Sequence, residues 1–186
     1  MGKLIYISGG ARSGKSGFAE KYIEERYEKK IYLATGIAFD DEMKDKISKH
    51  KRKRGKNWKT IENYKNIPTL LKGHIEGYDA ILLDCLTNMV SNLMILENDI
   101  DWEKVTIEEV NKIKEKMVKE VKKILNFVEE NDIDMVVVSN ELGMGLVPNN
   151  YLGRYFREIA GKINQIAAEK SEEAYFVVSG IPMKLK

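Results

Sequence analysis

The sequence predicts an α/β fold with a mainly parallel central sheet that is covered by helices on both faces. Short apolar runs alternate along the chain with longer segments whose apolar residues recur at helical spacing, as in strand–helix–strand units. The runs are apolar almost throughout, as expected for strands buried on both faces. With 14 Gly and 3 Pro in 186 residues, long linkers are not expected, and residues 1–186 are predicted to form a single domain.

The predicted strands are short runs rich in β-branched, aromatic or other apolar residues. They are residues 3–8, 31–34, 58–61, 78–84, 134–139 and 174–179. In parallel sheets, ligands bind beyond the carboxyl ends of the strands. Candidate site residues therefore follow or end these runs, namely Gly9, Thr35, Asp84, Asn140 and Gly180.

Helices are predicted between these strands. Residues 16–30 have apolar side chains at helical spacing, and residues 66–75 carry Pro68 where a first helical turn tolerates it. Residues 106–130 form a long charged segment with a single apolar stripe. The remaining predicted helices are residues 86–96 and 151–168.

Composition excludes several classes of protein. No run approaches about 18 apolar residues, so a transmembrane helix is not expected. The first residues lack the apolar region and small-residue cleavage site of a signal peptide. The single cysteine, Cys85, excludes an intrachain disulfide framework and favours a cytoplasmic location.

Positive charge is concentrated in one stretch. Residues 44–59 contain nine Lys or Arg and one Asp, a net charge of +8, whereas the rest of the chain has 22 basic and 28 acidic residues, a net charge of −6. Asp40 and Asp41 are suitable N-caps for a helix that runs into this stretch. Such a concentration of cations predicts an anionic ligand.

A glycine-rich segment matches the phosphate-binding pattern G-x-x-x-x-G-K-[ST] between a predicted strand and a predicted helix. The backbone N–H groups of such a loop point at phosphate oxygens, and the helix N-terminus adds positive potential. Lys15 is expected to reach the β- and γ-phosphates. The alternative is an ordinary glycine turn. The loop residues are Gly9, Gly10, Ala11, Arg12, Ser13, Gly14, Lys15 and Ser16.

Asp84 ends an apolar run at the edge where the loop is expected. Proteins with this loop commonly use an acid at the end of a neighbouring strand to help hold Mg²⁺. We therefore expect Ser16 and Asp84 to bind Mg²⁺, although Asp84 also suits a simple turn. The adjacent Cys85 is interpreted as a small buried residue without a redox role.

His50 lies within the basic stretch and has three interpretations. It is a solvated histidine on a charged face, part of a nucleic-acid patch, or a nucleophile that attacks a nucleotide phosphate. On a helix, Lys46, His50 and Arg54 would share one face, and the cations would favour the neutral, nucleophilic imidazole. Within the stretch, Trp58 is the only Phe, Tyr or Trp, and it lies near the end, which weakens the nucleic-acid interpretation.

Several segments together resemble one known family. With His50, they are GGARSGKS at 9–16, YLATG at 32–36, DDEM at 40–43, LLDCLT at 82–87, VSNL at 90–93, SNELGMGLVP at 139–148, GRYFR at 153–157, GKINQ at 161–165 and VSGIP at 178–182. The chain thus resembles the bifunctional adenosylcobinamide kinase / adenosylcobinamide-phosphate guanylyltransferase family of cobalamin biosynthesis.

The resemblance implies two reactions. ATP or GTP phosphorylates the aminopropanol hydroxyl of adenosylcobinamide. GTP then guanylylates an enzyme histidine with release of pyrophosphate, and the GMP passes to adenosylcobinamide phosphate to give adenosylcobinamide-GDP. The resemblance also implies a three-layer, RecA-like P-loop fold, one nucleotide-binding domain over residues 1–186, and a homotrimer.

The resemblance assigns roles to individual residues. It implies that His50 is the guanylylated histidine and that the nucleotide is contacted at several matched positions besides the loop. These positions are Ala34, Thr35, Gly36, Lys51, Arg52, Lys53, Arg54, Glu62 and Asp84.

Glu141 follows a predicted strand and has two interpretations. It orients or deprotonates the substrate hydroxyl, or it pairs with Arg154 or Arg157. Gly143 and Gly145 would let a bulky corrinoid approach the loop closely. The apolar residues between and after them are expected to touch either the corrin ring or a neighbouring subunit; these are Met144, Leu146 and Val147.

Two alternative functions remain at this point. One is a small-molecule P-loop kinase that has no covalent step. The other is a nucleic-acid-binding NTPase that uses the basic stretch, which would be stimulated by polynucleotide. We expect the corrinoid enzyme, with no nucleic-acid partner and no membrane span.

Overall fold

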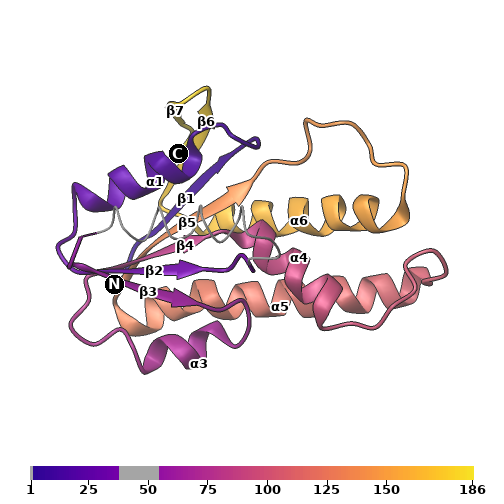
Figure 1. The fold of residues 1–186 in the computed structure, drawn as a ribbon, viewed down its shortest axis with the longest axis horizontal. Helices are drawn as coiled ribbons and strands as arrows, with labels where there is room; N and C mark the ends of the chain where they lie inside the picture. The colour runs from indigo at the N-terminus through magenta and orange to yellow at the C-terminus, as the bar shows by residue number, and fades with distance from the viewer. Residues whose placement is uncertain (1, 38–54) are drawn as a thin grey trace.

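The computed structural model describes residues 2–37 and 55–186. They form a seven-stranded sheet with the strand order β3-β2-β4-β5-β1-β6-β7 (Figure 1). All neighbouring strands are parallel except β6 and β7. The strands are β1 Leu4–Gly9, β2 Lys30–Ala34, β3 Trp58–Glu62, β4 Ala80–Asp84, β5 Asp134–Asn140, β6 Glu173–Val178 and β7 Ile181–Lys184.

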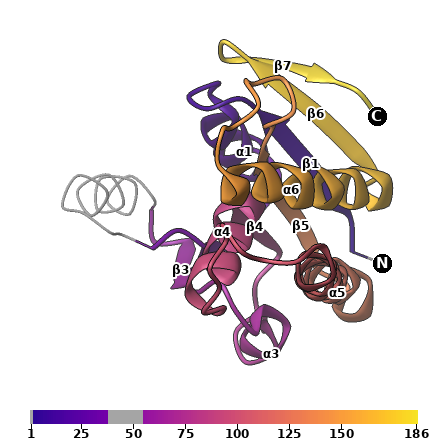
Figure 2. The same ribbon diagram turned by 90° about the vertical axis from the view of Figure 1, so that its right-hand side faces the viewer.

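Helices cover both faces of this sheet, which confirms the predicted α/β class. Helix α1 packs on one face, and α3, α4, α5 and α6 pack on the other (Figure 2). The helices are α1 Lys15–Glu24, α3 Ile67–Lys72, α4 Leu86–Leu96, α5 Ile107–Asn131 and α6 Tyr151–Lys170. None of the helices described is long and apolar enough to span a membrane.

The central strands contribute to both cores because successive side chains point to opposite faces. In β1, Ile5 and Ile7 pack beneath α1, whereas Leu4 and Tyr6 pack beneath the helices on the other face. All six residues of β1 are buried. This two-sided burial explains the nearly continuous apolar runs in the sequence.

Two boundaries differ from the sequence prediction. The first helix ends at Glu24 rather than at Lys30, because the Asp79 carboxylate accepts the backbone N–H groups of Glu28 and Lys29 at 3.1 and 2.7 Å and holds them outside a helix. Helix α3 is also shorter than predicted. The helix expected from Asp40 and Asp41 lies outside the described residues.

The strand β7 was not predicted. It pairs antiparallel with β6 through a two-residue turn in which Ser179 and Gly180 have φ values of 50° and 81°. Positive φ at both positions is the geometry of a tight hairpin turn. All four β7 residues are exposed, so the strand lacks the buried apolar pattern that identified the others.

Tyr22 of α1 and Tyr175 of β6 make the free energy of unfolding depend on pH in the alkaline range. The Tyr22 and Tyr175 hydroxyls donate to Glu173 at 3.2 and 2.5 Å. Burial, together with the Glu173 carboxylate, raises the pKa of Tyr22 and of Tyr175 to about 12 from the ordinary value of 10.0. The folded protein therefore retains protons that the unfolded chain releases.

We expect the free energy of unfolding to fall as the pH rises from 10 to about 12. Chemical denaturation across this range measures the effect. The double variant Tyr22→Phe, Tyr175→Phe should show a flatter decline, whereas Tyr151→Phe, which alters an exposed ring on α6, should match the wild type. An equally steep decline in the double variant would exclude these two tyrosines as the cause.

Candidate nucleotide site

Residues 10–14 connect the end of β1 to the start of α1 (Figure 1). The Ser13 N–H donates to the Gly10 carbonyl at 3.2 Å, and the Phe18 N–H donates to the Gly14 carbonyl at 3.0 Å. Gly14 is the N-cap with φ of 92°, which favours glycine, and no side chain caps the helix. The first N–H groups of α1 are therefore available to an anion.

Lys15 lies inside this loop. Its side chain is buried, and its Nζ donates to the Gly10 carbonyl at 3.0 Å. Burial lowers the pKa of Lys15, while the nearby acidic groups of Cys85 and Asp84 oppose this shift. A buried ammonium whose hydrogen-bond partner is a neutral carbonyl gains strongly when a phosphate oxygen replaces that carbonyl.

The loop is supported from the β6–β7 hairpin. The Gly180 N–H donates to the Ser13 carbonyl at 2.7 Å. Gly9 packs so closely that a Cβ there would lie 2.5 Å from the Val177 carbonyl oxygen and 2.6 Å from the Ser13 hydroxyl. That hydroxyl is buried and has no hydrogen-bond partner among the described residues.

Asp84 ends β4 beside the first turn of α1. Its carboxylate accepts hydrogen bonds from Ser16 and from the Tyr32 hydroxyl, the latter at 3.2 Å. Burial raises the pKa of the Asp84 carboxyl, and the two hydrogen bonds act in the opposite direction. Hydroxyl and carboxylate oxygens are the ligands that Mg²⁺ prefers, so Ser16 and Asp84 fit the predicted metal role.

The described residues contain no cluster of three or more His, Cys, Asp or Glu that could hold a metal ion. A Mg²⁺ ion at Ser16 and Asp84 would therefore complete its coordination with phosphate and water oxygens. This division of ligands is usual for magnesium at nucleotide sites.

A pocket lies at the end of β2. It has a volume of about 330 Å³ and is lined by Ala34, Thr35, Gly36, Ile37, Glu62, Asn63 and Tyr64. The parallel register places Ala34 beside Glu62 of β3 and beside Asp84 of β4. The predicted contact residues Ala34, Thr35, Gly36 and Glu62 thus line one pocket next to the candidate metal ligands.

Thr35 fixes the floor of this pocket. Its buried hydroxyl donates to the Cys85 carbonyl at 2.6 Å and accepts from the Cys85 N–H at 2.8 Å. The Asn92 amide donates to the Thr35 carbonyl at 2.7 Å. The ends of β2 and β4 are therefore locked to each other and to α4. The Asp84–Cys85 peptide bond, which directly follows β4, is cis.

The end of β5 adjoins the phosphate loop directly. Asn140 pairs with Gly9 in the sheet register, and the Glu141 N–H donates to the Gly9 carbonyl at 2.9 Å. The Asn140 amide donates to the Thr87 hydroxyl at 2.7 Å, and its carbonyl accepts from Asn164 of α6 at 2.9 Å. The start of the following loop is therefore held against both the phosphate loop and α6.

The Glu141 carboxylate accepts the backbone N–H of Gly143. Arg154 and Arg157 donate to backbone carbonyls of the same loop, at Asn149 and Gly143 respectively. Among the described residues, the ion pair with one of these arginines, which is one of the two interpretations of Glu141, does not form. The arginines hold the loop through its backbone instead.

Comparison with known proteins decides the family. Residues 5–185 match the family model for cobinamide kinase / cobinamide phosphate guanyltransferase. The chain belongs to this family. It is therefore a transferase of cobalamin biosynthesis with cobinamide kinase and guanylyltransferase activities, as predicted.

Curated relatives of this kinase/guanyltransferase family match over nearly their whole length. The chain is 39% identical to the bifunctional adenosylcobalamin biosynthesis protein CobU of Salmonella typhimurium, covering 98% of this chain and 99% of the relative. It is 36% identical to CobU of Escherichia coli, with the same coverage. The chain is 33% identical to the CobP protein of Pseudomonas aeruginosa, and the match covers 97% of this chain and 95% of that relative.

A solved KaiC-like protein of Pyrococcus horikoshii shares the fold. The TM-score is 0.53 at 11% identity, covering 94% of this chain and 70% of that chain. At this identity the likeness supports only the P-loop α/β architecture. It agrees with the RecA-like fold expected for the kinase/guanyltransferase family.

The structure gathers most of the predicted site of this family member at one edge of the sheet. The phosphate loop, the β2 end, Glu62 and Asp84 adjoin one another there, and Glu141 borders the loop. His50 and the predicted contacts Lys51, Arg52, Lys53 and Arg54 lie outside the described residues. Tyr32 was not among the predicted site residues, although it begins the YLATG segment, and its hydroxyl reaches Asp84 because β2 and β4 are neighbours in the sheet.

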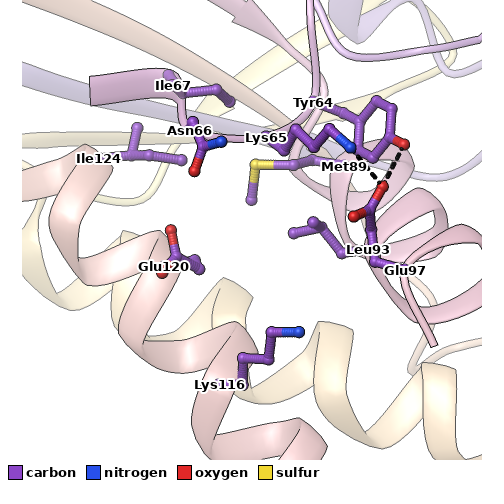
Figure 3. Close-up of a pocket in the computed structure, with 10 residues that line it drawn as sticks. All are labelled: Tyr64, Lys65, Asn66, Ile67, Met89, Leu93, Glu97, Lys116, Glu120 and Ile124. Atoms are coloured by element: carbon purple, nitrogen blue, oxygen red, sulfur yellow. Dashed lines mark hydrogen bonds and ion pairs between the residues drawn. The ribbon is translucent and has the colours of Figure 1, made fainter. Parts of the chain in front are cut away.

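A further hollow adjoins the β2-end pocket and shares Tyr64 with it (Figure 3). Its volume is about 250 Å³, and its walls come from α3, α4 and α5. Glu97 accepts from the Tyr64 hydroxyl at 2.7 Å and pairs with the Lys65 Nζ at 2.9 Å across the mouth of this hollow. These contacts hold the segment that carries Tyr64 against α4.

Proposed function

We propose that this family member carries out both reactions at one nucleotide site, with residues 1–186 acting as a single nucleotide-binding domain. The observation that supports this best is the convergence of Lys15, Ser16 and Asp84 with the pocket at the β2 end. One triphosphate would place its phosphates in the loop of Gly9–Ser16 and the rest of the nucleotide against Ala34–Gly36 and Glu62.

In the kinase reaction, ATP or GTP would donate its γ-phosphate to the hydroxyl of adenosylcobinamide. Lys15 and the free N–H groups of α1 would neutralise the β- and γ-phosphates. Ser16 and Asp84 would hold Mg²⁺, which supplies charge neutralisation between the phosphates when bound. Glu141 adjoins the loop through its backbone N–H, which donates to the Gly9 carbonyl, and its carboxylate would turn from the Gly143 N–H to orient the incoming hydroxyl.

In the guanylyl transfer, an imidazole nitrogen of His50 would attack the α-phosphorus of GTP. A P–N bond forms while the bond to pyrophosphate breaks, and pyrophosphate leaves. A phosphate oxygen of adenosylcobinamide phosphate then attacks the same phosphorus and releases the histidine. Lys51, Arg52, Lys53 and Arg54 would stabilise the negative charge on the transferred and leaving groups.

We also propose a substrate class, an oligomeric state and a cellular location for the enzyme. The substrate is a corrinoid, and we propose a homotrimer that works in the cytoplasm without a nucleic-acid partner. The basic stretch at residues 44–59 would serve the triphosphate rather than a polynucleotide.

Incubation with α-labelled GTP and Mg²⁺ tests the covalent step. We expect label to remain on the denatured protein and to be released by acid, as a phosphoramidate is. His50→Ala should retain no label. His74→Ala is the matched control, because His74 is the other histidine of the chain and its ring is already paired with the Lys59 Nζ at 3.2 Å. The His74→Ala variant should label like the wild type.

Two outcomes would contradict this proposal. Equal labelling of His50→Ala would exclude His50 as the nucleophile. Nucleotide turnover with no labelled wild-type protein would instead indicate a kinase that lacks the covalent step.

A further inference from the structure

We propose that the corrinoid substrate binds in the hollow between the β5–α6 loop and helix α6. There Arg157 donates a hydrogen bond to an oxygen at the edge of the corrinoid ring. This hollow has a volume of about 530 Å³, and its lining includes Glu141, Gly143, Val147, Arg157, Lys162 and Gln165. The inference rests on the proposed function. It adds the residues that recognise the second substrate.

The position of the hollow suits a group that must meet the triphosphate. The strand β5 lies between β4, which ends at Asp84, and β1, which leads into the phosphate loop. Its loop starts at Glu141, whose N–H donates to Gly9 at 2.9 Å, and extends beyond the carboxyl edge of the sheet (Figure 1). A ligand held along this loop would therefore lie beside the bound phosphates.

The loop presents apolar side chains to solvent. Met144 is 82% exposed, Leu146 is 96% exposed and Val147 is 66% exposed. Apolar side chains clustered in one loop with this exposure indicate a surface that a ligand or a second subunit covers, and we assign it to the ligand because the loop begins beside the phosphate loop. A corrinoid is amphipathic, with a broad apolar ring and amide groups around its rim, so the loop would cover the ring while the charged side chains of the hollow receive the rim.

Arg157 supplies the polar contact. Its Nη2 donates to the Gly143 carbonyl at 2.5 Å, whereas its Nη1 is buried and has no hydrogen-bond partner among the described residues. A buried guanidinium N–H without a partner costs free energy. A small rotation of the Arg157 side chain into the hollow that it lines would give this N–H a carbonyl or phosphate oxygen as its partner. The substrate offers both, as amide carbonyls on the rim and as the phosphate of the phosphorylated intermediate.

The acids of the hollow are already engaged. Glu158 pairs with the Lys114 Nζ at 2.5 Å, and the Glu141 carboxylate accepts the Gly143 N–H. Arg154, Arg157 and Lys162 also line the hollow, so cationic side chains outnumber the acids even with Lys114 paired. The surface is therefore complementary to an oxygen-rich or anionic rim.

Equilibrium dialysis of cobinamide against the full-length protein tests this inference. We expect Arg157→Met and Leu146→Ser each to weaken cobinamide binding by about tenfold or more. Leu185→Ser is the matched control, since Leu185 is also an exposed leucine, 68% exposed, beyond β7. It should bind cobinamide like the wild type. Leu146 projects into solvent, so its replacement is not expected to disturb folding.

A parallel measurement with cobinamide phosphate distinguishes the two oxygen sources. Equal weakening of both ligands by Arg157→Met identifies an amide carbonyl as the partner. Weakening of the phosphorylated ligand alone identifies its phosphate. Either result supports the inference.

Labelling by α-labelled GTP separates this inference from the proposed function, because that step needs no corrinoid. We expect both variants to be labelled like the wild type. Normal labelling with unchanged binding of both ligands in both variants would overturn the corrinoid site. A change of oligomeric state in Leu146→Ser with unchanged binding would assign the loop to a subunit contact and also overturn it.

Discussion

Lys15→Met is expected to lose both the kinase and the guanylyltransferase reactions, each by about a hundredfold or more. The ammonium lies inside the phosphate loop, and among the described residues its hydrogen-bond partner is the Gly10 carbonyl at 3.0 Å. If both reactions use one nucleotide site, the same group serves both triphosphate complexes. Parallel assays of corrinoid phosphorylation and of protein labelling from GTP measure the two losses.

The same variant should not be less stable than the wild type. Because burial lowers the pKa of Lys15, the fold disfavours its charged form, and an apolar side chain of similar length relieves that cost. Lys21→Met is the control, since Lys21 lies on the same helix and its side chain is 75% exposed. Loss of only one reaction in Lys15→Met would argue for two separate nucleotide sites.

Gly9→Ala is expected to destabilise the fold by about 1–3 kcal/mol and to weaken nucleotide binding. The added Cβ would lie 2.5 Å from the Val177 carbonyl oxygen, which belongs to the backbone of β6 and has no freedom to rotate away. It would also lie 2.6 Å from the Ser13 hydroxyl. Either the strand or the phosphate loop must move. Chemical denaturation and nucleotide titration measure the two effects.

Gly10→Ala provides the comparison, because a Cβ at Gly10 meets no atom within 4 Å. Its free energy of unfolding should stay within about 0.5 kcal/mol of the wild type. If the two alanine variants are equally stable, the close packing of Gly9 against β6 does not contribute as proposed.

The elements that could be predicted are those whose residue pattern lies within one short segment of the sequence. The central strands were recognised because burial on both faces demands apolar side chains at every position, as in Ala80–Asp84. The phosphate loop was recognised because its glycines and Lys15 lie within one short segment. The strand β7 carried no such signal, since its side chains are exposed and Pro182 interrupts any strand pattern.

The supports of the site could not be predicted because they join residues far apart in the sequence. The Thr35 hydroxyl contacts the backbone of Cys85, and the Tyr32 hydroxyl reaches Asp84, only because β2 and β4 become neighbours in the sheet. Glu141 illustrates the converse. The ion-pair interpretation gave its carboxylate Arg154 or Arg157 as a partner farther along the chain, whereas it accepts the N–H of Gly143, two residues away.

The sheet order has a consequence for protein synthesis. The ribosome makes β1 first, but the neighbours of β1 in the sheet are β5 and β6, and the Ser13 carbonyl depends on the N–H of Gly180. A nascent chain that has emerged only as far as α5 therefore contains the whole phosphate-loop sequence without the strands that hold it in shape. We therefore expect nucleotide to stabilise the fold only late in synthesis, and the edges of β1 remain open to incorrect pairing until translation reaches β6.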